Sequence, residues 1–242
     1  MQKTAIVTGA SRGIGAATAL HLSRNGYRVV INYLKSADRA KALLAQIKGE
    51  GNEASIFKAD VSKSDEANAL VNFAIDYYGA LDLVVNNAGV SLFSLVTETD
   101  DEQYEKVFGV NTKGVFNMCR SSVSFMINRK RGAIINIGSM WGRVGASCEA
   151  VYSASKAAVE GFTKALAKEI SPSGITVNCI APGLIDTEMN SNLTKEDIEA
   201  IVEVTPAGKM GTPEDIARLV LFLAREDYIT GQIISCDGGL TI

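Results

Sequence analysis

The sequence TGASRGIG occupies residues 8–15, between a short apolar run and an amphipathic stretch. Gly9 suits a sharp exit from a strand, Gly13 lets the backbone approach a pyrophosphate, and Gly15 lets the following helix pack closely on a sheet. The free N–H groups and the positive dipole at the start of that helix favour phosphate. Clustered glycines alone are weak evidence because many turns use glycine. Their position between a strand and a helix predicts a dinucleotide site.

Outward from this loop, short apolar runs alternate with longer amphipathic stretches along the 242 residues. We predict strands at 4–8, 28–33, 54–59, 81–86, 132–137, 176–180 and 232–236. We predict helices at 14–25, 37–49, 64–78 (N-cap Ser62 or Ser64), 101–128, 150–170, 195–204 and 213–224. The segments that connect successive strands are too long for hairpins. The pattern therefore predicts an α/β fold: a Rossmann-type, doubly wound, seven-stranded parallel sheet with helices on both faces. No linker divides residues 1–242, which predicts one domain, with ligands beyond the carboxyl ends of the strands.

Charge and composition exclude several classes of function. The net charge is −3 and the pI about 5.4, so we expect no nucleic-acid partner and no membrane surface. One histidine, His21, and four dispersed cysteines without a CxxC pair predict no metal site. The chain shows no secretory leader and no apolar run near the ~20 residues that cross a bilayer, so we expect a cytoplasmic protein.

The second strand indicates which nicotinamide is used. Asn32 stands where a carboxylate would hold the adenosine ribose of NAD, while Arg12 and Lys35 offer positive charge for a 2′-phosphate. We therefore predict NADP(H), and expect Asn32→Asp to repel that phosphate. After the third strand, Asp60 could accept from the adenine amino group while Val61 packs on the ring. Asp60 could equally cap the next helix.

Tyr152 and Lys156 are four residues apart on a predicted helix and therefore share one face. A phenol of pKa ~10 is a poor acid–base group at neutral pH, and a nearby ammonium lowers that pKa. The tyrosine can then exchange a proton with a carbonyl or alcohol oxygen. Such a pair alone is usually ordinary surface sequence. Its context favours catalysis, because Ser139 follows the fifth strand and could hold the substrate oxygen, and Asn111 could support a water that leads to Lys156.

The remaining predicted contacts follow the carboxyl ends of the strands. For the cofactor they are Gly9, Ser11, Arg12, Gly13, Ile14, Gly15, Asn32, Lys35, Asp60, Val61, Asn87, Ala88, Gly89, Tyr152, Lys156, Pro182, Gly183, Ile185 and Thr187. For the substrate they are Ser139, Trp141, Glu149, Tyr152 and Met189. The stretch 184–205 is the natural lid, which we expect to become ordered when substrate binds.

Taken together, TGASRGIG, NNAG at 86–89, Asn111, Ser139, YSASK at 152–156 and APG at 181–183 resemble the short-chain dehydrogenase/reductase family. The resemblance covers essentially the whole chain in order and spacing. It implies that Asn111, Ser139, Tyr152 and Lys156 form the catalytic tetrad, that hydride comes from a nicotinamide, and that no metal takes part. It also implies a homotetramer, with helices 101–128 and 150–170 in one interface and the last strand in the other.

Within that family the chain is most similar to bacterial 3-oxoacyl-acyl-carrier-protein reductases, through the closing segment 229–242 and the pair Asn32-Tyr33. This implies NADPH-dependent reduction of a 3-oxoacyl thioester in fatty acid biosynthesis. The segment SMWGRVGASCE at 139–149 resembles the elongation factor P 5-aminopentanone reductases, whose ketone carries a primary amine. Glu149 could pair with that amine, or could stand at the helix start, where an acid is favoured. A hydroxysteroid or other small-alcohol dehydrogenase, and a cofactor-binding regulator without catalysis, are the further alternatives.

Overall fold

A parallel β-sheet runs through the computed structural model, which describes residues 2–191 and 193–242. In these residues the sheet has seven strands in the order β3-β2-β1-β4-β5-β6-β7, and every neighbouring pair is parallel. The strands are β1 (Lys3–Val7), β2 (Tyr27–Tyr33), β3 (Ala54–Lys58), β4 (Leu83–Asn86), β5 (Gly132–Ile137), β6 (Ile175–Pro182) and β7 (Ile233–Cys236). The predicted α/β fold class is confirmed. Residue 192 of the predicted lid lies outside the described residues.

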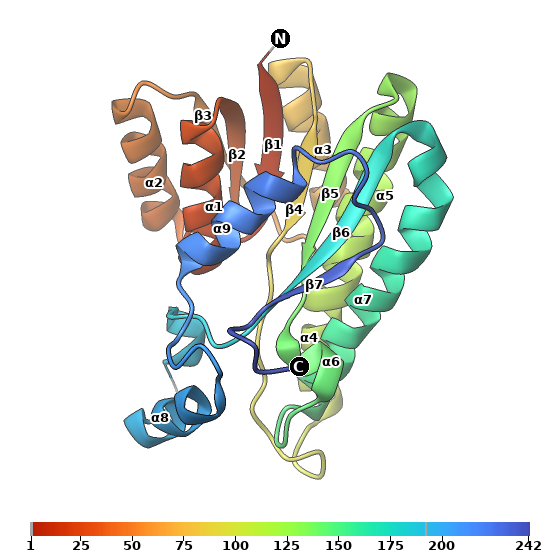
Figure 1. Cartoon of the computed structure of the whole chain (residues 1–242). Coiled ribbons are helices and arrows are strands. Elements are labelled where there is room, and N and C mark those ends of the chain that lie inside the picture. Colours follow the sequence, from red (N-terminus) through yellow and green to blue (C-terminus); the bar gives the residue numbers. More distant parts are fainter. Residues whose placement is uncertain (1, 192) are drawn as a thin grey trace.

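Helices cover both faces of this sheet (Figure 1). They are α1 (Gly13–Arg24), α2 (Ala37–Gly49), α3 (Ser64–Tyr78), α4 (Asp101–Phe108), α5 (Gly114–Arg129), α6 (Met140–Val144), α7 (Ala150–Ile170), α8 (Lys195–Val204) and α9 (Pro213–Leu223). One apolar core joins the sheet to α1, α2 and α9, and a second joins its other face to α3, α5 and α7. Leu22, Leu43 and Val220 are fully or almost fully buried in the first core, and Leu70, Met118 and Val159 in the second.

Most predicted elements agree with the structure to within one or two residues, and three features differ. The helix predicted at 101–128 is interrupted by a π-helical turn, η1 (Gly109–Lys113), between α4 and α5. The short helix α6 was not predicted. The predicted N-cap of α3 is wrong, because Lys63 occupies that position without a side-chain cap. The hydroxyl and backbone N–H of Ser62 donate instead to Asp60, at 2.7 and 3.0 Å.

The chain changes direction across the sheet at β1, which pairs with β2 on one side and β4 on the other. The loops after β1 and β4 therefore lie side by side. The Thr8 hydroxyl oxygen accepts hydrogen bonds from the backbone N–H groups of Asn87 and Ala88, both at 2.9 Å. The Asn87 side chain donates to the carbonyl oxygens of Thr8 and Gly9, at 2.9 and 3.2 Å. This switch point is where an open α/β sheet binds its ligand.

Two absences apply to the part of the chain that the structure describes. None of the helices there is long and apolar enough to span a lipid bilayer. No three His, Cys, Asp or Glu side chains gather there in a way that could hold a metal ion.

Candidate active site

The glycine loop between β1 and α1 takes a shape that requires glycine at three positions. Gly9 and Gly13 have φ angles of +60° and +53°, in the left-handed region that residues with a Cβ rarely adopt. A Cβ on Gly15 would lie 2.5 Å from the Asn87 side-chain nitrogen and 2.6 Å from the Gly9 carbonyl oxygen. Each glycine therefore lets the loop fold tightly between the first helix and the NNAG segment.

The N-terminus of α1 has the properties of a phosphate site. Arg12 is the N-cap residue, and among the described residues no side chain caps the helix and no acid stands in its first turn. The first N–H groups of a helix lack intrahelical partners, and the dipole there is positive. The glycine loop and the uncapped helix end thus fit the pyrophosphate of a dinucleotide, with Ser11, Gly13, Ile14 and Gly15 around it.

The structure shows which groups the Asn32 side chain contacts. Its side chain is buried, and its oxygen accepts from the backbone N–H of Gly9 at 3.1 Å. Its amide nitrogen donates to the carbonyl oxygens of Ala59 and Phe57, at 3.1 and 3.3 Å. The polar atoms of Asn32 are therefore hydrogen-bonded to the backbone. The side chain ties the glycine loop to the end of β3.

Two other predicted adenosine contacts also have partners within the chain. Asp60 accepts from Ser62 in the turn before α3, but does not stand at the N-cap position of that helix. The Val61 side chain is buried in the core against Gly114 of α5. Lys35, by contrast, follows β2 and is exposed.

The four predicted catalytic residues are all buried: Ser139 follows β5, Asn111 lies in η1, and Tyr152 and Lys156 lie on α7. Ser139 is the N-cap of α6 and accepts from the backbone N–H of Trp141 at 3.2 Å. Tyr152 and Lys156 lie one turn apart on α7, and the Lys156 Nζ atom is 5.8 Å from the centre of the Tyr152 ring. That Nζ atom donates to the carbonyl oxygen of Ile137, the last residue of β5, at 2.8 Å.

Burial moves the pKa values of the tyrosine and lysine in opposite directions. For Tyr152, burial has the largest effect and raises the pKa. A hydrogen bond with the Ser139 side chain lowers it, and repulsion from the Glu149 carboxylate raises it, so that the resulting pKa is about 12. Burial lowers the pKa of Lys156 to about 8. The net shift of the tyrosine is thus upward, opposite to the expected direction, because removing a phenolate from water outweighs its hydrogen bond. In the free protein Tyr152 is a protonated phenol at neutral pH.

The π-helical turn η1 directs Asn111 into the protein. This fully buried side chain donates to the Val90 carbonyl oxygen at 2.9 Å and to the Ser155 hydroxyl at 3.0 Å, and accepts from the Val90 N–H at 2.8 Å. A Cβ on Gly89 would lie 3.4 Å from both the Asn111 oxygen and the Lys156 Nζ atom. Asn111 and Lys156 therefore border the same backbone segment, and Asn111 forms hydrogen bonds with both the N–H and the carbonyl group of Val90 in it. π-Turns of this kind are frequent at functional sites.

Glu149 stands at the N-cap position of α7 but makes no side-chain cap hydrogen bond with any described residue. Its carboxylate also has no ion-pair partner there, although it is half-buried, and burial raises its pKa. The same carboxylate raises the pKa of Tyr152. It is thus an uncompensated anion close to the predicted proton donor, in the segment that connects Ser139 to Tyr152.

The segment after β6 lies across the glycine loop. Gly183 packs against the backbone of Asp237, and Ile185 is buried against Gly211, so these two anchor the segment. The methyl group of Thr187 would be 3.3 Å from a Cβ on Gly13. Met189 is 46% exposed.

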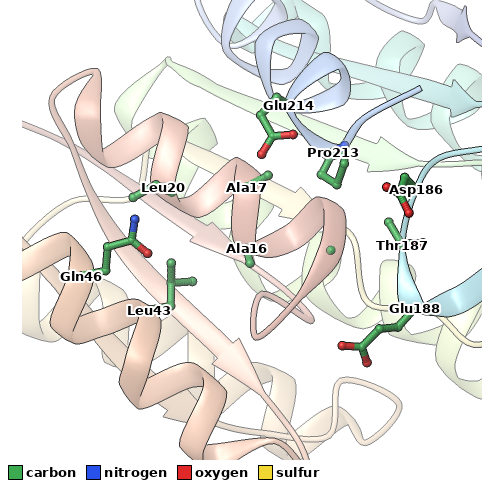
Figure 2. A pocket seen from close by; sticks show the side chains of 11 residues that line it. Ala16, Ala17, Leu20, Leu43, Gln46, Asp186, Thr187, Glu188, Pro213 and Glu214 are labelled. Carbon is green, nitrogen blue, oxygen red and sulfur yellow. The ribbon is translucent and has the colours of Figure 1, made fainter. Parts of the chain in front are cut away.

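A groove of about 450 Å³ lies between this segment, α1, α2 and the start of α9 (Figure 2). It is lined by Gly13, Ala16, Ala17, Leu20, Leu43, Gln46, Asp186, Thr187, Glu188, Pro213 and Glu214. None of the four predicted catalytic residues lines it. The groove therefore adjoins the glycine loop and the segment after β6 and does not include the predicted proton-transfer residues.

Several residues that shape the site were missed by the sequence interpretation. Thr8 holds the two loops together, and Ser155 accepts from Asn111. Arg39 on α2 and Glu188 after β6 form an ion pair across 149 residues of sequence. Thr8 carried a signal, since it ends a strand beside the glycine loop. The sequence holds no signal for the pairing of Arg39 with Glu188, because this pairing depends on how two distant segments meet in the fold.

Comparison with known proteins gives four consistent likenesses. The family model described as short chain dehydrogenase matches residues 3–198. The chain is 40% identical over 242 residues to a 3-oxoacyl-acyl-carrier-protein reductase of Staphylococcus aureus, covering 99% of this chain and 98% of that one. It is 43% identical over 244 residues to such a reductase of Synechocystis, covering 99% and 97%. A solved structure, titled as a putative gluconate dehydrogenase of Agrobacterium tumefaciens, superposes with a TM-score of 0.94 at 32% identity, over 99% of this chain and 96% of that one.

Proposed function

The chain belongs to the short-chain dehydrogenase family of nicotinamide-dependent oxidoreductases, and from this we propose that it reduces a ketone to a secondary alcohol with NADPH. The observation that carries the proposal is the buried Tyr152 phenol, which lies one helical turn from Lys156 and whose pKa is raised by burial and lowered in part by a side-chain hydrogen bond with Ser139. The proposed substrate is a 3-oxoacyl thioester on acyl carrier protein, supported by the names of the relatives that match nearly the whole chain.

Each residue has a defined task in the proposed reaction. A bound nicotinamide would supply the hydride for the carbonyl carbon. The Ser139 hydroxyl orients the carbonyl oxygen, and the Tyr152 O–H gives that oxygen its proton, because its pKa of about 12 keeps it protonated. The Lys156 ammonium favours the phenolate that remains and would contact the ribose. Asn111 keeps the backbone at Val90 in place beside it.

The preference for NADP(H) is proposed on the charges around the adenosine end. The end of β2 presents Asn32 with its polar atoms already bonded, so no carboxylate there would hold a free 2′-hydroxyl or repel a phosphate. Arg12 is exposed at the glycine loop and Lys35 is exposed after β2. Guanidinium and ammonium groups suit a phosphate.

Steady-state turnover tests this function. We expect the protein to oxidise NADPH with an acetoacetyl thioester, and to use NADH at least about tenfold less efficiently. A hydroxysteroid with NADP⁺ serves as the competing substrate. Turnover of the steroid but not of the thioester would refute the thioester assignment. Cofactor binding without turnover of any substrate offered would favour a non-catalytic regulator.

A second substrate is favoured by one observation, the uncompensated carboxylate of Glu149. A half-buried anion beside the proton donor is costly unless a cation joins it, and a ketone that carries a primary amine brings one. The 5-aminopentanone group on a modified lysine of elongation factor P has this chemistry. We expect Glu149→Gln to lower kcat/KM for the amine-bearing ketone about tenfold while that for a neutral thioester changes little. Equal effects on both substrates would remove the support for this candidate.

The homotetramer remains part of the proposal. It is supported by apolar side chains on the helices expected in one interface: Phe116 of α5 is 43% exposed and packs edge-on against Phe162 of α7, with ring centres 6.3 Å apart. Light scattering on the purified protein should give four times the chain mass of 25.7 kDa. A monomeric mass would exclude this assembly.

A further inference from the structure

A single carboxylate holds two guanidinium groups together at the edge of the glycine loop. One oxygen of Glu188 accepts from Arg12 Nη1 at 3.1 Å, and its other oxygen accepts from Arg39 Nη1. The three residues come from the glycine loop, from α2 and from the segment after β6. Figure 2 shows Glu188 extending from that segment towards the side of the groove on which Leu43 of α2 lies.

The charges of this cluster do not balance. Two guanidinium groups share one carboxylate, so the cluster keeps a net charge of about +1. The other acid near the start of α2, Asp38, is paired with Lys41 at 3.9 Å. The side chains of Arg12, Arg39 and Glu188 are 51–59% exposed. Exposed ion pairs of this kind are weak, because water screens both partners, so a better anion can replace the carboxylate.

The position of the cluster indicates which anion that is. Arg12 precedes the first turn of α1, where the cofactor phosphates fit, and Arg39 lies in the first turns of the helix that follows β2. The strand end between them is where α/β sheets recognise the adenosine ribose. A ribose 2′-phosphate carries a charge of about −1.5 to −2 and three acceptor oxygens. It can therefore engage both guanidinium groups more strongly than one carboxylate does.

We propose that Arg12 and Arg39 together bind the 2′-phosphate of NADP(H), and that Glu188 occupies this site until the cofactor displaces it. The proposal rests on the preference for NADP(H) proposed above and adds Arg39 and Glu188 as residues that determine it. Displacement also frees the segment after β6 from the glycine loop and from α2. The 2′-phosphate thus has a second effect that the 2′-hydroxyl of NAD lacks: it releases the lid segment.

Equilibrium binding to the full chain tests this exchange without relying on turnover. The probes are NADP⁺, NAD⁺, adenosine 2′,5′-bisphosphate and ADP, measured by calorimetry at low salt. We expect Glu188→Gln to tighten NADP⁺ and the bisphosphate about 2- to 5-fold, because it removes the competing anion. We expect Arg39→Gln to weaken the same two probes about tenfold. NAD⁺ and ADP should change less than about twofold in both variants.

A matched control is Glu50→Gln, which removes a comparable surface pair, the one between Glu50 and Arg24 at 2.6 Å, from outside the cluster. It should leave all four affinities unchanged. The proposal would be overturned if Glu188→Gln changed the affinities for probes with and without a 2′-phosphate equally. An unaltered NADP⁺ affinity in Arg39→Gln would also overturn it. The wild-type affinities distinguish a failure of the proposed NADP(H) preference from a failure of the exchange. If NAD⁺ binds as tightly as NADP⁺, the preference fails. If the wild type prefers NADP⁺ but the variants bind it with unchanged affinity, only the exchange is refuted.

Discussion

The side-chain oxygen of Asn32 accepts a hydrogen bond from the backbone N–H of Gly9 at 3.1 Å, while its amide nitrogen donates to the Ala59 carbonyl oxygen at 3.1 Å. One buried amide thus connects the ends of β1, β2 and β3. Asn32 therefore acts on the backbone of the glycine loop, and we expect its substitution to affect that loop before it affects any ligand.

Asn32→Asp is therefore expected to impair the protein broadly. A carboxylate would lose both donated hydrogen bonds and face the carbonyl oxygens of Phe57 and Ala59, at a cost of about 3 kcal/mol in the free energy of unfolding. Urea denaturation measures this loss, and binding of both NAD⁺ and NADP⁺ should weaken. Full stability with a selective loss of NADP⁺ binding would instead support the direct repulsion of the 2′-phosphate that the sequence predicts.

Tyr152→Phe removes only the proposed proton donor. We expect the rate of ketone reduction to fall by about 10²- to 10⁴-fold, with NADP⁺ affinity retained because the ring still fills its buried position. Stopped-flow absorbance at the NADPH band measures the rate. The matched control is Tyr228→Phe, whose side chain is 96% exposed and whose rate should equal that of the wild type. A Tyr152→Phe rate within tenfold of the wild type contradicts the mechanism.

The pH dependence of reduction should follow the lysine rather than the tyrosine. Below pH 8 Lys156 is charged and Tyr152 is protonated, so kcat/KM should be level with respect to these two groups. Above pH 8 the lysine loses its charge, and kcat/KM should fall about tenfold per pH unit, because it reports groups of the free enzyme. A profile that stays level to pH 10 would show that the ammonium is not needed.

The contribution of the same lysine to the free energy of unfolding should rise with pH, whereas kcat/KM falls. Its pKa is about 8 in the folded chain against the ordinary 10.5, so between these values the unfolded chain binds the extra proton. Stability contributed by this residue therefore rises from pH 8 to 10.5. The difference in unfolding free energy between wild type and Lys156→Met, followed by urea titration across this range, should move in favour of the wild type. A difference that is constant with pH would contradict the shifted pKa.

Two glycine substitutions should differ sharply. Gly15→Ala places a Cβ 2.5 Å from the Asn87 side-chain nitrogen and 2.6 Å from a backbone oxygen, so we expect a loss of about 1–3 kcal/mol together with weaker NADP⁺ binding. Gly49→Ala, near the end of α2, meets no atom of the described chain within 4 Å and should be neutral or stabilising by up to about 1 kcal/mol. Thermal unfolding and calorimetry compare the two variants. Similar effects would mean that the close packing at Gly15 is not needed.

The sequence predicted the features that depend on local pattern. The boundaries of α2, α3, β5, α7 and α8 agree with the prediction to the residue, because the apolar periodicity and the residues that flank these elements are local features of the sequence. The spacing of Tyr152 and Lys156 was equally local, since four residues on a helix share a face.

The features that the sequence did not predict depend on tertiary contacts. The direction of the Asn32 side chain follows from which atoms of β3 and the glycine loop surround it. The upward pKa shift of Tyr152 follows from burial, which a motif does not report. The π-helical turn at Gly109–Lys113 leaves the apolar pattern of a long helix nearly unchanged, although glycines at 109 and 114 border it.

The double acceptance by the Thr8 hydroxyl, from the N–H groups of Asn87 and Ala88, has a thermodynamic consequence. It fixes the loops after β1 and β4 before any nucleotide arrives, so their conformational entropy has already been lost on folding. Binding then requires little further ordering at the phosphate end. We expect the remaining entropic cost of forming the complex to fall mainly on the predicted lid and on the substrate. Affinity for the cofactor should then depend little on which ketone follows it.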